Sequence, residues 1–412
     1  MDVIIKGKKL EGNLIIPPSK AVSHRAIICA CLAEGRSIIK NVNMCDDVKN
    51  TINILKQIVP IQINENTLVV DGGIKEIKNN NFDINESAST LRFLLPILSF
   101  FADHEIIFNL KTELSQRIGD EYSSLYDNKK EKYEFDKNTI TTFKFPQKTK
   151  YKLSTKTTSQ AVTGVLLLSP FLGKNTTIKT SNNNSVGYID LTIEVMKKFG
   201  VEAKRRNKTI SINKNQKFKP TNYIIPPDAS FAVNVAVMNK LGSNIKIIND
   251  TFDTNEPDYL LYKKIINNTP SVLDVKKNPD SVFAFSMLSL VSDDKKITNT
   301  TRLQKKETNR EKAIQYLFES FKANTPIFKH NKIVLKKTKF AAKGEFESKK
   351  DHRLCFVGII ISTVVEEVVI KNFECVSKSY PNILEDFLKI GLNFTIKQNS
   401  SWYKNLKTYA LL

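Results

Sequence analysis

Six times along the chain, a short polar motif is followed at once by an apolar run, a turn and a strand-like segment. The apolar runs are AVSHRAIICACLA, ASTLRFLLPILSFF, AVTGVLLLSPFLG, FAVNVAVMNKLG, VFAFSMLSLVS and LCFVGIIISTVV. Runs of this length and composition predict buried helices, and the segments after them, RSIIKNV, HEIIFNL, TTIKT, NIKII, KKITNTT and EEVVIKNF, predict strands. The motifs recur at roughly 50–70 residues, which indicates an internal repeat.

The polar motifs stand where the helices should begin. They are Ser19-Lys20, Glu86-Ser87, Thr158-Ser159-Gln160, Asp228-Ala229-Ser230, Pro279-Asp280-Ser281 and Asp351-His352-Arg353. Ser, Thr and Asp are common N-cap residues, so capping alone explains any single motif. If the units fold alike, however, six helix N-termini carry polar side chains, and helix N-termini favour the binding of anions.

The alternation of helices and strands predicts an α/β or α+β architecture. Pro17-Pro18 and Pro226-Pro227 hold equivalent places in the repeat pattern, so we expect the chain to cross between two domains near 16–20 and 225–229. One predicted domain comprises residues 19–227, and it is inserted into a discontinuous domain of residues 1–18 and 228–412. The polar stretch 122–150 shows no clear period and predicts an exposed excursion with weak strands.

Composition places the chain among ordinary globular proteins, with 41% hydrophobic and 25% charged residues. No segment approaches the ~18 consecutive apolar residues of a membrane span. The N-terminal MDVIIKGKKLEGNLIIP lacks the apolar core of a secretion signal, so we expect a cytoplasmic protein that is not bound to membranes. Five cysteines and four histidines show no zinc-like pairing, which predicts reduced, buried thiols and no metal site.

The formal net charge of +21 is compatible with binding to nucleic acid or to a membrane surface. The lysines are nevertheless scattered, and they are enriched together with Ile and Asn along the whole chain. No zinc finger, basic zipper or aromatic–basic ribonucleoprotein motif is present in the sequence. Solvated surface lysines are therefore the favoured interpretation, with a non-catalytic basic binding protein as the lower-ranked alternative.

Cations recur at the predicted helix starts. Lys306 and Arg310 lie four residues apart, where like charges repel by a few tenths of a kcal/mol, and a bound anion would relieve this repulsion. Lys20 and Arg25 stand at another helix start. Arg92 lies among apolar residues, where an unpaired guanidinium would be costly. Together these positions predict a site for a ligand with more than one negative group.

Five motifs resemble those of the enolpyruvyl transferases, and within them the 5-enolpyruvylshikimate-3-phosphate synthase family. They are Pro-Pro-Ser-Lys at 17–20, Ser-His-Arg at 23–25, Lys-Glu-Thr-Asn-Arg at 306–310, Asp-His-Arg at 351–353 and Ser-Lys-Ser-Tyr-Pro at 377–381. The motifs follow the order of the family from about Leu14 to Ile390. The resemblance implies two α/β (α+β) domains, each of three βαβαββ repeats, with the active site in the cleft between them.

The resemblance also implies an activity, without a metal or organic cofactor. The enolpyruvyl group of phosphoenolpyruvate would pass to the 5-hydroxyl of shikimate 3-phosphate, a step of aromatic amino-acid biosynthesis, and the enzyme would be a monomer. The residues that would bind phosphoenolpyruvate are Lys20, Ala88, Arg117, Arg310, Arg353 and Lys378. Those that would bind shikimate 3-phosphate are Arg25, Thr158, Ser159, Gln160, Ser185, Tyr188, Asp280 and Lys306. The catalytic residues would be Asp280, Glu307 and Lys20.

The chain departs from the family pattern at several positions. The replacements are Ala21 and Thr158 for serine, Asn309 for aspartate, Lys350 for asparagine, Ile118 for proline and Ala88 for glycine. None removes an acid, a base or a phosphate-binding cation, so we expect an active enzyme. A methyl group at Ala88 would intrude on the herbicide glyphosate, which is longer than phosphoenolpyruvate, and it therefore predicts glyphosate insensitivity.

Within the enolpyruvyl transferases the alternative substrate is UDP-N-acetylglucosamine, used in cell-wall synthesis. That enzyme lacks the Lys-Glu-x-x-Arg segment and usually carries a cysteine or aspartate in a loop near the position of Arg117. No cysteine lies between Cys45 and Cys355, which disfavours its common form.

Overall fold

The computed structural model describes residues 1–118, 121–126, 131–182, 184–292 and 294–397. The chain folds into two compact units. The terminal unit comprises Met1–Pro17 and Pro227–Leu412, and the inserted unit comprises Pro18–Pro226. The divisions fall within the two proline pairs of the sequence.

The inserted unit contains three sheets of four strands, and each joins one parallel strand pair to an antiparallel hairpin. Their orders are β14-β3-β5-β4, β6-β7-β9-β8 and β10-β11-β13-β12. The strands are β3 Gly35–Lys40, β4 Ile61–Asn64, β5 Thr67–Gly72, β6 Asn81–Asn85, β7 Ile106–Leu110, β8 Lys132–Asp136, β9 Thr139–Phe143, β10 Lys150–Leu153, β11 Thr176–Thr180, β12 Ala203–Arg206, β13 Thr209–Ile212 and β14 Asn222–Ile224.

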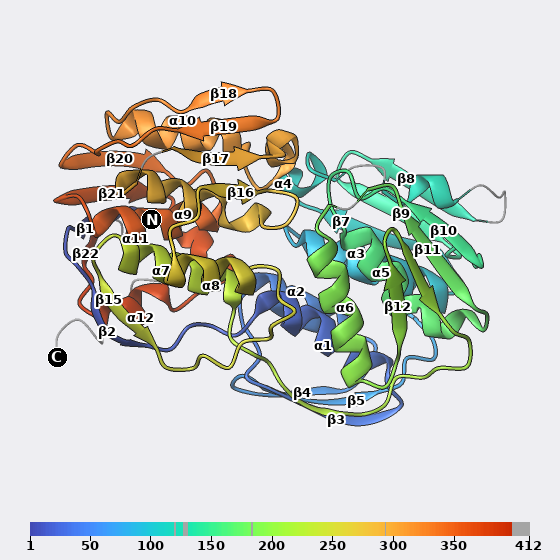
Figure 1. Cartoon of the computed structure of the whole chain (residues 1–412). Helices are drawn as coiled ribbons and strands as arrows, with labels where there is room; N and C mark the ends of the chain where they lie inside the picture. Colours follow the sequence, from blue (N-terminus) through green and yellow to red (C-terminus); the bar gives the residue numbers. More distant parts are fainter. Residues whose placement is uncertain (119–120, 127–130, 183, 293, 398–412) are drawn as a thin grey trace. The chain divides into compact units, whose positions relative to one another are not determined.

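The terminal unit repeats this plan in two of its sheets, whereas its third described sheet has only the parallel pair, and its strands come from both ends of the chain (Figure 1). Its sheets have the orders β15-β2, β16-β17-β19-β18 and β20-β21-β1-β22. The strands are β1 Val3–Lys6, β2 Glu11–Leu14, β15 Asn244–Ile247, β16 Val272–Asp274, β17 Lys295–Thr298, β18 Ile327–Lys329, β19 Lys332–Leu335, β20 Lys343–Glu347, β21 Glu367–Lys371 and β22 Asn393–Ile396. Because β1 pairs with both β21 and β22, the N-terminal segment completes a sheet whose other strands come from the end of the chain.

All six polar motifs lie at helix starts, as predicted. The helices that begin there are α1 Lys20–Leu32, α3 Ala88–Phe101 and α5 Gln160–Leu168 in the inserted unit, and α7 Ala229–Lys240, α9 Val282–Ser286 and α11 His352–Ser362 in the terminal unit. Their N-cap residues are Ser19, Ser87, Ser159, Asp228, Ser281 and Asp351. The strands predicted after them are also confirmed, as β3, β7, β11, β15, β17 and β21.

These motif-headed helices form the cores of the units. Almost every residue of α1, α5 and α11 is buried, as expected for a helix that is apolar on all sides. α3 packs against α5 in the inserted unit, and α7, α9 and α11 pack against one another in the terminal unit (Figure 1). The other helices are α2 Asp46–Leu55, α4 Thr112–Ser115, α6 Val186–Lys198, α8 Tyr259–Asn267, α10 Arg310–Ser320 and α12 Ile383–Leu388.

The prediction for residues 122–150 is confirmed for its strands and wrong for its exposure, in the part that the structure describes. Strands β8 and β9 form a regular hairpin that completes the second sheet of the inserted unit. Tyr122, Ile140 and Phe145 are buried in its core, and the Tyr122 hydroxyl donates to the Arg92 carbonyl at 2.5 Å. The aromatic anchors, which are spaced irregularly, explain why no period is visible.

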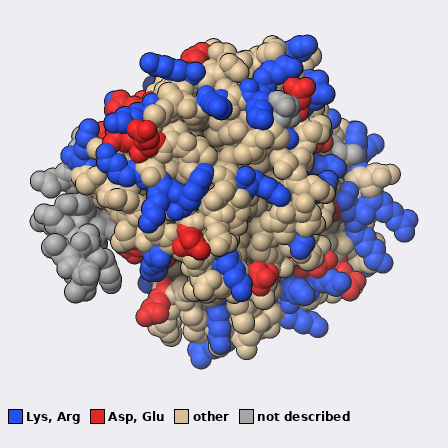
Figure 2. All heavy atoms as spheres, turned by 60° about the vertical axis from the view of Figure 1, so that its left-hand side comes forward, with Lys and Arg blue, Asp and Glu red and all other residues tan. Residues whose placement is uncertain are grey.

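The cysteines and the surface charges lie as predicted from the sequence, among the residues that the structure describes. All five cysteines are buried free thiols. On the face shown in Figure 2, Lys and Arg side chains are spread among other residues, with Asp and Glu between them. No helix among the described residues is long and apolar enough to cross a membrane.

Candidate active site

Arg310 is the centre of a carboxylate cluster in the terminal unit. It is the first residue of α10 and is fully buried. Its Nε donates to Asp351 Oδ2 at 3.1 Å, Nη1 to Asp280 Oδ1 at 2.9 Å and Nη2 to Glu307 Oε2 at 2.7 Å. Three carboxylates from three segments are thus held by one planar guanidinium, whose fixed fork sets their relative positions.

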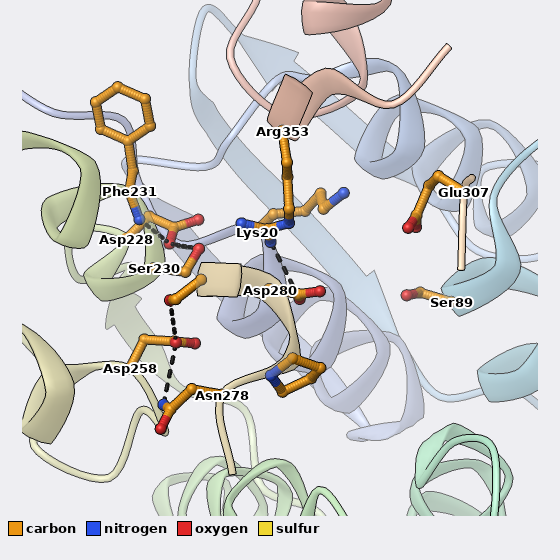
Figure 3. Close-up of polar contacts among 12 residues, drawn as sticks. Lys20, Ser89, Asp228, Ser230, Phe231, Asp258, Asn278, Asp280, Glu307 and Arg353 are labelled. Atoms are coloured by element: carbon orange, nitrogen blue, oxygen red, sulfur yellow. Dashed lines mark hydrogen bonds and ion pairs between the residues drawn. The ribbon is translucent and has the colours of Figure 1, made fainter. Parts of the chain in front are cut away.

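Two of the three carboxylates reach the surface of the unit. The side chains of Asp280 and Glu307 are 23% and 29% exposed, whereas Asp351 is fully buried behind them. Arg353, in the first turn of α11, adds a second cation to Asp280, with Nη2 and Oδ2 3.1 Å apart (Figure 3). Asp280 therefore lies between two arginines, and part of its side chain remains exposed to solvent.

The cations fix the charge of Asp280. Burial by itself raises the pKa of this carboxyl, but Arg353, Arg310 and Lys306 outweigh burial and hold the pKa well below its usual range. Burial also lowers the pKa of Lys306 to about 8, against the opposing pull of Asp280. At neutral pH the cluster therefore holds an ionised Asp280 beside a protonated lysine whose charge is easily lost.

Lys378 lies in the short 3-10 helix Phe373–Lys378 of the same unit. Its Nζ donates to the carbonyl of Lys350 at 3.3 Å, immediately before the start of α11. Lys349 and Lys350 have φ angles of +50° and +60°, in the left-handed region that most side chains avoid. The expected asparagine would tolerate the φ at position 350 better than lysine, which gives a structural meaning to this departure.

Lys20 and Arg25 occupy the first turns of α1 in the inserted unit. The side chain of Ser19 caps the helix by accepting from the Val22 amide at 3.2 Å. Lys20 Nζ lies 2.8 Å from Asp47 Oδ2, and its side chain is 18% exposed. Arg25 is buried, with Nε donating to Thr192 Oγ1 at 2.8 Å.

A chain of hydrogen bonds fixes the side chain of Gln160. Arg92 Nη1 donates to Gln160 Oε1 at 2.7 Å, and Gln160 Nε2 donates to Ser89 Oγ at 2.8 Å. Arg92 is paired in turn with Glu121, whose Oε1 accepts from Nε at 3.1 Å and from Nη2 at 2.7 Å. The guanidinium that the sequence places among apolar residues is therefore neutralised, and it orients the amide of Gln160.

The close approach of α3 and α5 makes this chain of hydrogen bonds possible. A Cβ atom added to Gly164 in α5 would lie 2.2 Å from the carbonyl oxygen of Arg92 in α3. Any side chain there would force the helices apart, so glycine is required by packing.

The remaining residues expected at shikimate 3-phosphate surround the starts of α5 and α6. Thr158 Oγ1 accepts from the Gln160 amide at 3.2 Å, and Ser159 is the buried N-cap of α5. Ser185 precedes α6 with a φ of +52°. The carbonyl of Tyr188 accepts from Arg25 Nη2 at 3.2 Å, which joins this region to α1.

Arg117 and Ala88 belong to one neighbourhood at the start of α3. Ala88 is the first residue of the helix, after the N-cap Ser87. Arg117 Nη2 donates to the carbonyl of Glu86 at 3.4 Å, and its Nε donates to the Glu113 carbonyl at 3.0 Å. Arg117 therefore contacts the chain two residues before Ala88 and places a cation near this helix start.

The structure brings several predicted residues together in the terminal unit, and in the inserted unit it links Arg25 to Tyr188. In the terminal unit Asp280, Glu307, Arg310 and Arg353 form one cluster, with Lys306 close enough to shift the pKa of Asp280. Sequence reasoning missed four supporting carboxylates: Asp351 binds Arg310, Asp258 binds Ser281, Glu121 binds Arg92 and Asp47 binds Lys20. Of these four residues, only Asp351 belongs to a motif recognised in the sequence, which is Asp-His-Arg at 351–353. Among the described residues, no group of three His, Cys, Asp or Glu is arranged to hold a metal ion.

Comparisons with known proteins agree with the motifs and the fold. A family model described as EPSP synthase (3-phosphoshikimate 1-carboxyvinyltransferase) matches residues 4–268 and 232–387. A 3-phosphoshikimate 1-carboxyvinyltransferase of Clostridium perfringens is 32% identical over 421 residues, covering 94% of this chain and 98% of that protein. The Clostridium acetobutylicum protein of the same name is 31% identical, covering 93% of this chain and 95% of its own length.

Solved structures share the architecture. The EPSP synthase of Acinetobacter baumannii, solved at 2.37 Å, has a TM-score of 0.79 at 19% identity and covers 97% of this chain and 100% of its own. An enolpyruvyl transferase of Streptomyces tendae has a TM-score of 0.74 at 12% identity, covering 96% and 98%. The chain therefore has the enolpyruvyl transferase fold and belongs to the EPSP synthase family.

Proposed function

We propose that the protein is a 3-phosphoshikimate 1-carboxyvinyltransferase, which transfers the enolpyruvyl group of phosphoenolpyruvate to the 5-hydroxyl of shikimate 3-phosphate and releases phosphate. The observation that supports this most directly is the pair of partly exposed carboxylates, Asp280 and Glu307, on one buried arginine. Membership of the EPSP synthase family supplies the reaction to which such a pair is suited.

The reaction needs two proton transfers in opposite directions. The methylene carbon of phosphoenolpyruvate must gain a proton while the attacking hydroxyl loses one, and the methyl group formed must lose a proton as phosphate leaves. Asp280, held ionised by Arg353 and Arg310, is in the charge state that can accept the hydroxyl proton. Glu307 in its protonated form donates a proton to the methylene carbon and takes one back during elimination, and the proton on Asp280 leaves with the phosphate.

Cations are proposed to bind the phosphate and carboxylate groups of phosphoenolpyruvate. The assigned residues are Lys20, Arg117, Arg310, Arg353 and Lys378, with Ala88 beside them. Arg310 already holds three carboxylates, so a direct contact with the substrate requires one of them to give up its place. Holding Asp280 and Glu307 is the role that its geometry supports best.

Shikimate 3-phosphate is proposed to bind through Arg25, Thr158, Ser159, Gln160, Ser185, Tyr188, Asp280 and Lys306. The amide of Gln160 is oriented before any ligand arrives, which lowers the entropic cost of binding. As the sequence predicts, the enzyme is proposed to be a cytoplasmic monomer that uses no metal or organic cofactor.

Release of inorganic phosphate from phosphoenolpyruvate tests the proposal. We expect release only when shikimate 3-phosphate is also present, and none when UDP-N-acetylglucosamine replaces it. Phosphate release with UDP-N-acetylglucosamine but not with shikimate 3-phosphate would show that the sugar nucleotide is the acceptor. A protein that releases no phosphate with either acceptor would not be such an enzyme.

A further inference from the structure

A buried carboxylate outside the assigned residues lies directly behind Asp280. Asp258 immediately precedes α8 and is 1% exposed. Its Oδ1 accepts from Ser281 Oγ at 2.6 Å and from Asn278 Nδ2 at 3.1 Å. Figure 3 shows Asp258 beside Asn278, and it is Asn278 that lies on the segment leading to Asp280.

The two donors flank the turn that presents Asp280. This turn is the single 3-10 turn Pro279–Ser281, and Asn278 is its N-cap. Asn278 Nδ2 also donates to the Pro257 carbonyl at 2.8 Å, so the loop before α8 is fastened to the turn at neighbouring points. One oxygen of Asp258 thereby fixes both ends of a segment too short to hold its own conformation.

We propose that Asp258 is a positioning residue for Asp280, which fixes the turn through Ser281 and Asn278 and sets the basicity of the Asp280 carboxylate through its own negative charge. The inference rests on the proposed function, in which Asp280 accepts a proton.

The two hydrogen bonds do not explain why the residue at position 258 is a carboxylic acid. A neutral amide could accept from the same two donors, and burying a carboxylate is costly. Burial, with a further contribution from the negative charge of Asp280, raises the pKa of Asp258 to about 6. The hydrogen bonds from Ser281 and Asn278 and the charge of Arg353 lower this pKa, but burial outweighs them. Because like charges disfavour one another, an ionised Asp258 makes Asp280 a stronger proton acceptor between its two arginines.

Two substitutions separate geometry from charge. In Asp258→Asn the amide oxygen can take the place of Oδ1, so the charge is lost while these two hydrogen bonds are kept. Asp258→Ala removes the charge and leaves both donors without this acceptor. Asp253→Asn is the matched control, because Asp253 lies in the same loop and its carboxylate accepts from the backbone and side-chain amides of Asn255, at 2.9 and 3.0 Å.

Steady-state phosphate release from pH 5 to pH 8 is the test, with shikimate 3-phosphate and phosphoenolpyruvate as substrates. We expect kcat to fall about 3–10-fold in Asp258→Asn and about 100-fold in Asp258→Ala, with KM changed less than about threefold. The ratio of wild-type to Asp258→Asn kcat should be largest above pH 7 and approach one near pH 5, because the wild-type Asp258 is then protonated as well. Asp253→Asn should match the wild type throughout.

The outcomes distinguish this inference from the proposed function. A wild-type protein that releases no phosphate contradicts the proposed function itself. If the wild type is active, two results overturn the inference that the charge of Asp258 acts on Asp280. The kcat of Asp258→Asn could equal that of the wild type, or it could be lower by a factor that does not change with pH. If Asp258→Ala does not fold, the pH dependence of the Asp258→Asn ratio still decides.

Discussion

Asp280 and Glu307 are hydrogen-bonded to the two terminal nitrogens of the same guanidinium, that of Arg310, at 2.9 and 2.7 Å. Both carboxylates are partly exposed, whereas the arginine is fully buried. Their separation is therefore set by a rigid group within the core of the terminal unit. Two carboxyl groups held in this way can exchange roles as acid and base without rearrangement of their support.

Glu307→Gln keeps the size and the hydrogen-bonding capacity of the side chain but cannot transfer a proton. We expect kcat to fall about 10²–10⁴-fold while substrate dissociation constants change little. Single-turnover kinetics and calorimetric binding measure the two effects separately. A kcat near that of the wild type would remove Glu307 from the mechanism.

Asp280→Ala should damage both chemistry and binding, because Asp280 is assigned a contact with shikimate 3-phosphate as well as proton transfer. The substitution also leaves Arg310 and Arg353 with one anionic partner fewer. We expect a loss of kcat of at least about 10²-fold and a raised KM for shikimate 3-phosphate. A lowered kcat at constant KM would restrict Asp280 to proton transfer.

Binding of shikimate 3-phosphate should depend on pH through Lys306. Because burial lowers the pKa of Lys306 to about 8, its charge is present below pH 8 and is lost above it. A charge-assisted hydrogen bond contributes about 1.5–3 kcal/mol, so with this pKa the KM should rise about five- to tenfold as the pH increases from 7 to 9. In Lys306→Arg the charge persists, and the rise should disappear. An identical rise in the variant would assign it to another group.

Ala88→Gly should sensitise the enzyme to glyphosate far more than it changes the KM for phosphoenolpyruvate, because only the longer ligand meets the methyl group. Inhibition curves at matched substrate saturation measure this difference. Ala229→Gly is the control, since Ala229 is the first residue of α7 as Ala88 is of α3. Strong inhibition of the wild type, equal to that of Ala88→Gly, would contradict the steric explanation.

Lys350→Asn should stabilise the protein, because asparagine adopts the left-handed φ of +60° more readily than lysine. We expect the free energy of unfolding to increase by up to about 1 kcal/mol, measured by denaturant unfolding. Lys337→Asn serves as a control at an exposed position that is not among the residues with positive φ. Equal changes in both variants would assign the effect to the loss of a positive charge.

The local pattern of the sequence predicted the elements that begin each repeat. N-cap residues before apolar runs located all six central helices, because capping and burial act within a few residues. The packing of the hairpin β8–β9 was not predicted, because β9 pairs with β7, which stabilises the hairpin from elsewhere in the chain. Tertiary pairing there overrides weak local propensity.

In the candidate site, too, the sequence predicted some residues and not others. The motifs located Asp280, Glu307 and Arg310, but not the residues that support them. Asp258 and Glu121 lie in loops without a repeated pattern, and they contact Ser281 and Arg92 only after folding. Support of this kind is a property of three-dimensional packing, so a single sequence carries little sign of it.

Magnetic resonance of the product formed in heavy water tests the central claim, that Asp280 and Glu307 move protons during enolpyruvyl transfer. The proton added to the methylene carbon becomes equivalent to the other hydrogens of the methyl group before one is removed. The account predicts that phosphate release is accompanied by an enol ether at the 5-oxygen of shikimate 3-phosphate, with deuterium in its methylene group, and that Glu307→Gln slows deuterium incorporation and phosphate release together. Phosphate release without an enol ether, or an enol ether free of deuterium, would contradict it.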